Sequence, residues 1–229
     1  PFGVRRQLQG AVRILVDLPE LTGLDVAVDL DALVRTVGAA LPGAAYEAYA
    51  GELASFVRDR VRYLFTQRGF RGEEVDAAMG ATSGALQPLL VRRRLEALGA
   101  MRGSADFEAL AVLFKRVKNI AREVSAQPLA AYAQELQRDA LTEPAELALL
   151  AEFEARAPRI REALAAGDFS RAMTQTAAFR APVDRFFTEV FVMIDDVAVR
   201  TARLMLMVAL RDLVLDIADI SQLAVEGGR

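Results

Sequence analysis

The side chains in this sequence best suited to chemistry are cations, and they are concentrated in one segment. Residues 92–122 contain eight Lys or Arg residues and only three acidic ones. On a helix that starts near Asp106, Lys115, Asn119 and Arg122 are three and four residues apart and share one face. Long cations suit phosphate contacts and an amide suits a base edge, so the pattern favours RNA binding. A solvated helix flank would show the same pattern.

The same predicted helix carries a second, apolar face. Its members recur at spacings of three and four and are typical of a core: Phe107, Leu110, Phe114, Val117 and Ala121. Lys118 lies near the edge of that face, and Arg116 points to the opposite side. We therefore predict a basic RNA-binding surface, extended by arginines from other segments. Its members are Lys115, Arg116, Lys118, Asn119, Arg122, Arg180 and Arg203.

A second group of arginines alternates with aromatic residues between residues 56 and 71. The group consists of Arg58, Arg60, Arg62, Arg68 and Arg71, with Phe56, Tyr63, Phe65 and Phe70 among them. Aromatic rings among arginines can stack on bases. Helical spacing also places such rings in a core. Both interpretations remain open from the sequence.

Two acidic pairs, Glu73-Glu74 and Asp195-Asp196, are the remaining candidates for metal or acid–base chemistry. Neighbouring residues on a helix point about 100° apart, so a pair in sequence is not a paired site. The chain has no His and no Cys. That composition excludes Ser-His-Asp and Cys-His nucleophiles and the usual zinc sites. We expect no catalytic residue, no metal and no cofactor in this chain.

Helices must position these side chains. Hydrophobic residues make up 53% of the chain and recur at helical spacing, so we predict an all-α helical bundle. Prolines and glycines, Pro158 among them, divide it into about nine helices. We expect Asp106 to cap a helix running to about Val124, and Asp168 to open another. Further helices should begin near Pro144, in a first turn, and at Val183 after Pro182.

The C-terminal segment is expected to form a long pair of helices that bends at Asp195-Asp196. Its apolar residues are predicted to be core: Phe186, Phe187, Phe191, Met193, Leu204, Met205, Leu206 and Met207. The run from Leu204 to Leu215 is too short to cross a membrane and contains Arg211 and Asp212. We therefore expect no membrane association.

Size and charge restrict the remaining possibilities. A chain of 229 residues holds one large or two small domains, and Gly80–Gly84 is a candidate boundary. The net charge is −3, so any nucleic-acid site must be a local patch. The absence of cysteine fits a cytoplasmic protein. Because the sequence begins at Pro1 without Met, we expect a piece of a longer chain.

Five blocks resemble, in order, the β subunit of the bacterial glycyl-tRNA synthetase. They are Pro1–Arg6; Phe56–Met79, with Arg-Gly-Phe-Arg at 68–71; Phe114–Ile120; Phe179–Phe187, leading to Val192-Met193 and Asp195-Asp196; and Ile217–Ser221. Three positions depart from the family pattern. Thr188 replaces a usual Asp, Ala202 replaces the Asn that usually precedes Arg203, and Lys118 occupies a variable position.

This resemblance implies a fold and a function. Residues 92–229 would form a DALR-type anticodon-binding domain, and residues 1–91 a helical connector that follows an HD-like domain absent here. The chain would bind glycine tRNA through the anticodon arm and catalyse nothing itself. The partner α subunit, in an α2β2 tetramer, would attach glycine using ATP and magnesium. No DNA partner is implied.

Two alternatives are weighed against this interpretation. A remnant of an HD-type phosphohydrolase is excluded, because its metal site needs His ligands and the chain has none. A structural scaffold that holds the β subunit against α, with no direct RNA contact, stays open.

Overall fold

The computed structural model describes residues 2–40, 46–81, 85–125 and 138–223. These residues are helical and contain no strand, so the all-α prediction is confirmed for them. The α-helices are α1 (Phe2–Val16), α2 (Leu18–Thr22), α3 (Leu30–Ala40), α4 (Tyr46–Gln67), α5 (Gly72–Met79), α6 (Pro88–Ala100), α7 (Ala105–Ser125), α8 (Pro144–Ala165), α9 (Phe169–Ala177), α10 (Arg180–Glu189) and α11 (Val197–Leu215). Two short 3-10 helices, η2 (Arg138–Ala140) and η3 (Ile220–Leu223), follow α7 and α11.

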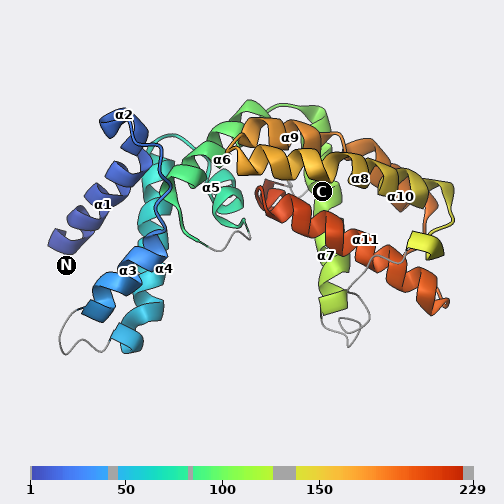
Figure 1. The fold of residues 1–229 in the computed structure, drawn as a ribbon, viewed down its shortest axis with the longest axis horizontal. Helices are drawn as coiled ribbons and strands as arrows, with labels where there is room; N and C mark the ends of the chain where they lie inside the picture. Colours follow the sequence, from blue (N-terminus) through green and yellow to red (C-terminus); the bar gives the residue numbers. More distant parts are fainter. Residues whose placement is uncertain (1, 41–45, 82–84, 126–137, 224–229) are drawn as a thin grey trace, which may run out of the picture.

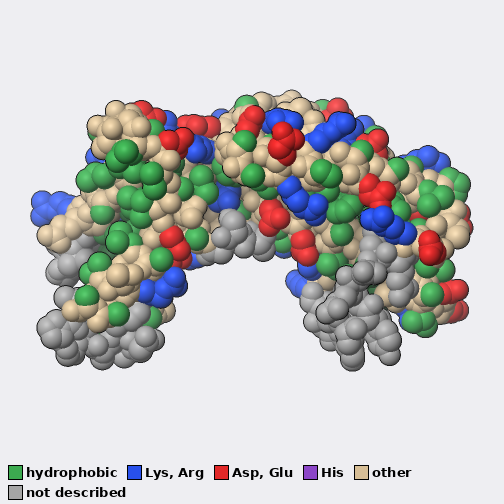
Figure 2. All heavy atoms as spheres, viewed as in Figure 1, with side chains coloured by type: hydrophobic (Ala, Val, Ile, Leu, Met, Phe, Trp, Pro, Cys, Tyr) green, Lys and Arg blue, Asp and Glu red, His purple; other side chains and the backbone are tan. Residues whose placement is uncertain are grey.

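The helices form an arch (Figure 1). Helices α1–α5 make one limb and α7–α11 the other, while α6 joins them by contacting α1 and α5 on one side and α9 on the other. Figure 2 shows the hollow beneath the arch. One continuous core of buried side chains runs through both limbs.

Helix α7 is central to the second limb, because it contacts α9, α10, α11 and η3. Its predicted apolar face is buried throughout, from Phe107 through Phe114 to Ala121. Burying such side chains contributes about 1.5–3 kcal/mol each for the large ones. The helical spacing in the sequence therefore identified this core face correctly.

Caps and turns decide where the helices begin. Asp168 caps α9 by accepting a hydrogen bond from the Arg171 backbone N–H at 2.9 Å, as expected. Asp196 caps α11 in the same way, accepting from the N–H groups of Ala198 and Val199. The prediction that Asp106 caps α7 is wrong, because α7 already begins at Ala105. The backbone N–H of Phe107, in the first turn, donates to the Ser104 hydroxyl instead.

Two proline expectations need correction. Pro158 lies inside α8 and does not end it. Proline removes one hydrogen bond, but the buried Ala157, Ile160 and Ala163 keep this stretch packed as a helix. Helix α10 begins at Arg180, ahead of the expected start at Val183.

The predicted core tract from Phe186 to Met207 is correct for six of its members and wrong for two. Phe186, Phe187 and the 204–207 group are buried or partly buried. Phe191 and Met193 are 84% and 58% exposed. Both lie in residues 190–196, the link between α10 and α11. The helical period that predicted their burial ends with α10.

The expected domain boundary stays a prediction. Residues 82–84 of the Gly80–Gly84 stretch lie outside the described residues. The segment between α11 and η3 contacts α5, which precedes this stretch in the chain: the Asp219 N–H donates to the Ala77 carbonyl at 2.9 Å. None of the described helices is long and apolar enough to cross a membrane.

Truncating the centre of α7 tests its role in the core. Phe114→Ala removes a ring that is 1% exposed, so we expect unfolding to become easier by about 3–5 kcal/mol. Val112→Ala on the same helix is a matched control, because Val112 is 54% exposed and should change stability by less than about 0.5 kcal/mol. Urea titration followed by circular dichroism measures both. Equal losses would contradict a central role for Phe114.

Candidate nucleic-acid interface

The outer face of α7 carries the predicted stripe. Lys115, Asn119 and Arg122 are all exposed, one helical turn apart. Toward the start of α7, the same exposed face continues with Val112 and then Glu108. Arg122 forms no ion pair with any residue that the structure describes. These three side chains therefore share one accessible surface, as the spacing predicted.

Arg116 lies beside this stripe and is fixed by an aromatic ring. Its guanidinium carbon lies 4.2 Å from the centre of the Phe187 ring on α10. A cation–π contact of this kind orients the guanidinium without neutralising its charge. Arg116 is exposed, so its N–H groups remain accessible to an anion.

Lys118 is turned to the other side of α7, toward η3. Its ammonium donates to the Asp219 carboxylate and to the Ser221 hydroxyl. Burial raises the pKa of Asp219, but hydrogen bonds from Lys118, Ser221 and Gln222 outweigh that effect and lower it overall. Lys118 therefore ties η3 to α7, and its charge is compensated.

Arg180 and Arg203 were expected to extend the basic surface. Arg180 is exposed but lies 3.5 Å from the Asp106 carboxylate, joining the first turn of α10 to that of α7. Arg203 is buried, so the expectation that it extends the surface is wrong. Its Nε donates to the buried Glu146, and its Nη1 donates to the Phe191 carbonyl at 2.6 Å.

Glu146 is a structural residue that the sequence analysis missed. It lies in the first turn of α8, and its other oxygen accepts from the backbone N–H groups of Thr142 and Glu143. A glutamate three residues after the N-cap residue, here Glu143, is a known capping signal, so the sequence did contain a clue. Its partner on α11, Arg203, was not deducible from spacing.

Most of the other arginines that made the sequence look basic form ion pairs, some with neighbouring acids on the same helix or turn and others with acids distant in the sequence. Arg92 pairs with Glu20 at 2.6 Å and Glu96 at 2.8 Å, and Arg93 pairs with Asp25 at 2.6 Å. The second basic group behaves likewise: its pairs are Arg58–Asp31, Arg62–Asp76, Arg68–Asp17 and Arg71–Glu74. Figure 2 shows this mixture of blue and red side chains over the upper part of the molecule.

The aromatic residues of the second group divide between the two interpretations. Phe65 is buried, and Phe70 packs edge-on against it. Tyr63 is exposed, and Arg60 lies over both its ring and that of Phe56, at 5.4 and 5.5 Å from the ring centres. Arg60 therefore covers one face of the Tyr63 and Phe56 rings, whereas Phe65 and Phe70 belong to the core.

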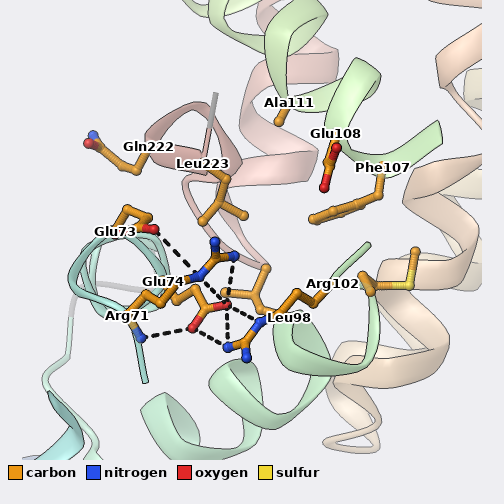
Figure 3. A pocket seen from close by; sticks show the side chains of 11 residues that line it. Arg71, Glu73, Glu74, Leu98, Arg102, Phe107, Glu108, Ala111, Gln222 and Leu223 are labelled. Atoms are coloured by element: carbon orange, nitrogen blue, oxygen red, sulfur yellow. Dashed lines mark hydrogen bonds and ion pairs between the residues drawn. The ribbon is translucent and has the colours of Figure 1, made fainter. Parts of the chain in front are cut away.

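Glu74 is the centre of a charged cluster at one wall of a cavity of about 340 Å³ (Figure 3). It accepts from Arg102 at 2.7 Å and from the backbone and side chain of Arg71. Burial raises the pKa of Glu74, but these hydrogen bonds outweigh it and hold the pKa below its usual value. Glu73 reaches Arg71 at 3.5 Å.

Residues of α7 and η3 complete the walls of this cavity. Phe107, Glu108 and Ala111 of α7 form its opposite wall, and Gln222 and Leu223 of η3 close one side (Figure 3). Among the described residues no group of three acidic side chains is arranged to hold a metal. Of the other acidic pair, Asp196 is occupied as the cap of α11.

Comparison with known proteins defines the class. Residues 111–221 match the family model of the DALR anticodon binding domain. They include the α7 stripe from Lys115 to Arg122.

The chain as a whole is similar to glycine–tRNA ligase beta subunits. It is 36% identical to that of Delftia acidovorans over 98% of its length, and 37% identical to that of Anaeromyxobacter dehalogenans over 99%. The beta subunit of Rhodospirillum centenum is 33% identical over 97%. The chain spans about 30% of the length of these relatives. The resemblance found in the sequence blocks is confirmed.

The buried pair between α8 and α11 is expected to be essential for stability. Arg203→Met leaves the Glu146 carboxylate buried without its cation, which should cost about 3–5 kcal/mol. Arg156→Met is the matched control, since it breaks a partly exposed pair with Glu152 and should cost about 1 kcal/mol or less. Urea unfolding measures both. Adding Glu146→Met to Arg203→Met should restore much of the loss; no recovery would contradict this account.

The lowered pKa of Glu74 predicts that the stability of the fold depends on pH. Its pKa is lower in the folded than in the unfolded chain, so its stabilising effect is present above the unfolded value of about 4.3 and is lost as the pH falls through the folded value. We expect Glu74→Gln to lower stability at pH 7 and to flatten the acid loss. Glu73→Gln, which changes a half-exposed neighbour, is the control. Parallel pH profiles for the parent and Glu74→Gln would contradict the prediction.

Proposed function

We propose that this chain binds glycine tRNA through the anticodon arm, using the exposed stripe of α7. The observation that carries the proposal is an accessible stripe of Lys115, Asn119 and Arg122 within the residues that match an anticodon binding domain. Arg116 borders the stripe, where the Phe187 ring orients it. Arg180 contributes at the start of α10, while Lys118 and Arg203 serve the fold.

The chemistry of the stripe suits a folded RNA loop. Cations contact phosphates and position the RNA, while an amide can both donate to and accept from a base edge. The net charge of −3 opposes general attraction of nucleic acid, so binding depends on this local surface. Recognition of this kind requires no catalytic group.

The glycine–tRNA ligase relatives suggest the wider setting. In this proposal the chain is part of a β subunit in the cytoplasm. A partner α subunit, in an α2β2 tetramer, attaches glycine with ATP and magnesium. The role of the present chain is to hold the tRNA for that reaction.

A scaffold role is the second candidate, and one observation favours it for the first limb. Helices α1, α3 and α4 line an open apolar groove of about 450 Å³, with Leu33 and Val37 exposed at its edge. Arg58, which follows the groove residue Val57 in the chain, is ion-paired with Asp31 at 3.4 Å. That limb is better suited to contact protein than RNA.

The α7 stripe is tested by removing two of its cations. Lys115→Ala combined with Arg122→Ala should weaken tRNA binding about tenfold or more at low salt. Each lost phosphate contact should also flatten the slope of log K against log salt by about 0.7 for single-stranded RNA. Filter binding of glycine tRNA across a salt series measures both. Arg35→Ala, which removes one exposed cation on α3, is the control for a loss of surface charge away from the stripe.

Asn119→Ala tests base recognition separately. Loss of an amide changes no charge, so the salt slope should stay the same while discrimination between glycine tRNA and an anticodon-altered tRNA falls by about five- to tenfold. An unchanged affinity and slope in the double cation variant would exclude α7 as the RNA surface, and the scaffold role would then be favoured.

A further inference from the structure

The link between α10 and α11, residues 190–196, exposes two large apolar side chains. Val190 and Val192 are buried, whereas Phe191 and Met193 point outward. Val190 has extended backbone angles, and the chain bends at Val192 and Met193. Phe191 and Met193 are the two large apolar side chains that this link exposes, and we call this pair the apolar tip.

The tip is held in place from beneath. The guanidinium of Arg203 donates to the Phe191 carbonyl, and that of Arg200 donates to the Ile194 carbonyl, each at 2.6 Å. Arg203 is in turn fixed by the buried Glu146. Exposing a Phe side chain in water forgoes about 1.5–3 kcal/mol of burial. The fold thus exposes an aromatic ring, at a cost in stability, on a backbone that two arginine side chains hold in place.

The tip belongs to the same limb as the α7 stripe. Asp106 contacts Arg180, and Arg116 contacts Phe187 farther along both helices, so α7 and α10 run in the same direction. Arg211 of α11 reaches the Ala121 carbonyl near the end of α7. Arg203, which holds the Phe191 carbonyl, lies eight residues before Arg211 in α11, which is about 12 Å at 1.5 Å per residue. In Figure 1 the link lies at the outer end of this limb.

The charges around the tip indicate what kind of group it fits. Glu189 is paired with Arg185 at 2.9 Å, and the Asp196 carboxylate caps α11. Asp195 is exposed beside Met193. With carboxylates on both sides and no exposed lysine in the link, the tip disfavours phosphate. An uncharged planar group that stacks on a ring is compatible with it.

We propose that the apolar tip is a stacking platform for an unpaired base of the bound RNA loop, with Phe191 as the ring and Met193 as its flank. The inference rests on the proposed tRNA binding and extends it to a second contact. The α7 stripe holds the phosphates of the anticodon arm, and the tip takes one base from its loop. The stripe and the tip therefore contribute different kinds of contact.

The test uses the complete protein in its natural assembly and two RNA hairpins. One reproduces the anticodon arm of glycine tRNA, and the other carries abasic nucleotides in the loop. Phe191→Ala should weaken binding of the first hairpin about tenfold, within the range measured for base–aromatic stacking. Phe191→Trp should bind like the parent, and Leu147→Ala, at another exposed apolar position, is the control. Thermal unfolding checks that the variants fold.

The second hairpin separates stacking from other effects. Without loop bases, the parent and Phe191→Ala should bind equally weakly, whereas the Lys115/Arg122 double variant should weaken binding of both hairpins. If Phe191→Ala binds the first hairpin as the parent does while the double variant does not, stacking is overturned and the proposed function stands. If the parent binds neither hairpin, both fail. If Phe191→Ala instead releases a co-purifying subunit with unchanged RNA affinity, the tip is a protein contact and stacking is overturned.

Discussion

The apolar face of α7 is the constraint on which the second limb depends. Burial of Phe107, Phe114 and Ala121 brings α9, α10, α11 and η3 around one helix. A helix packed on several sides has only a narrow face left for solvent. That face is the one that carries Lys115, Asn119 and Arg122. The core thus determines the orientation of the candidate RNA surface.

Charge neutralisation separates this surface from the other basic segments. In the sequence, Arg92, Arg93 and Arg102 belong to the same basic run as the α7 residues. In the structure they face Glu20, Asp25 and Glu74, which come from other elements. Partly exposed pairs of this kind add little stability singly. Their larger effect is to remove positive potential from the first limb and from α6.

The buried pair of Glu146 and Arg203 links the fold to its outer end. One carboxylate oxygen accepts from the backbone N–H groups of Thr142 and Glu143, just before α8, and the other accepts from Arg203 of α11. The same guanidinium holds the backbone of residue 191. Burying two charges is costly, and the hydrogen bonds on both partners offset that cost. The network therefore fixes the geometry of the link as well as joining two helices.

The sequence by itself determined the helical class, the core face of α7, and the start of α9 at Asp168. These features depend on residue type and short spacing, which act locally. It also pointed to the α7 stripe and to the family. Only the tertiary structure decided which cations stay accessible: it paired Lys118 with Asp219 and buried Arg203 against Glu146. It also exposed Phe191, because the helical period stops where α10 ends. Partners that lie 57 and 101 residues apart in the chain are brought together by packing, and no local pattern encodes them.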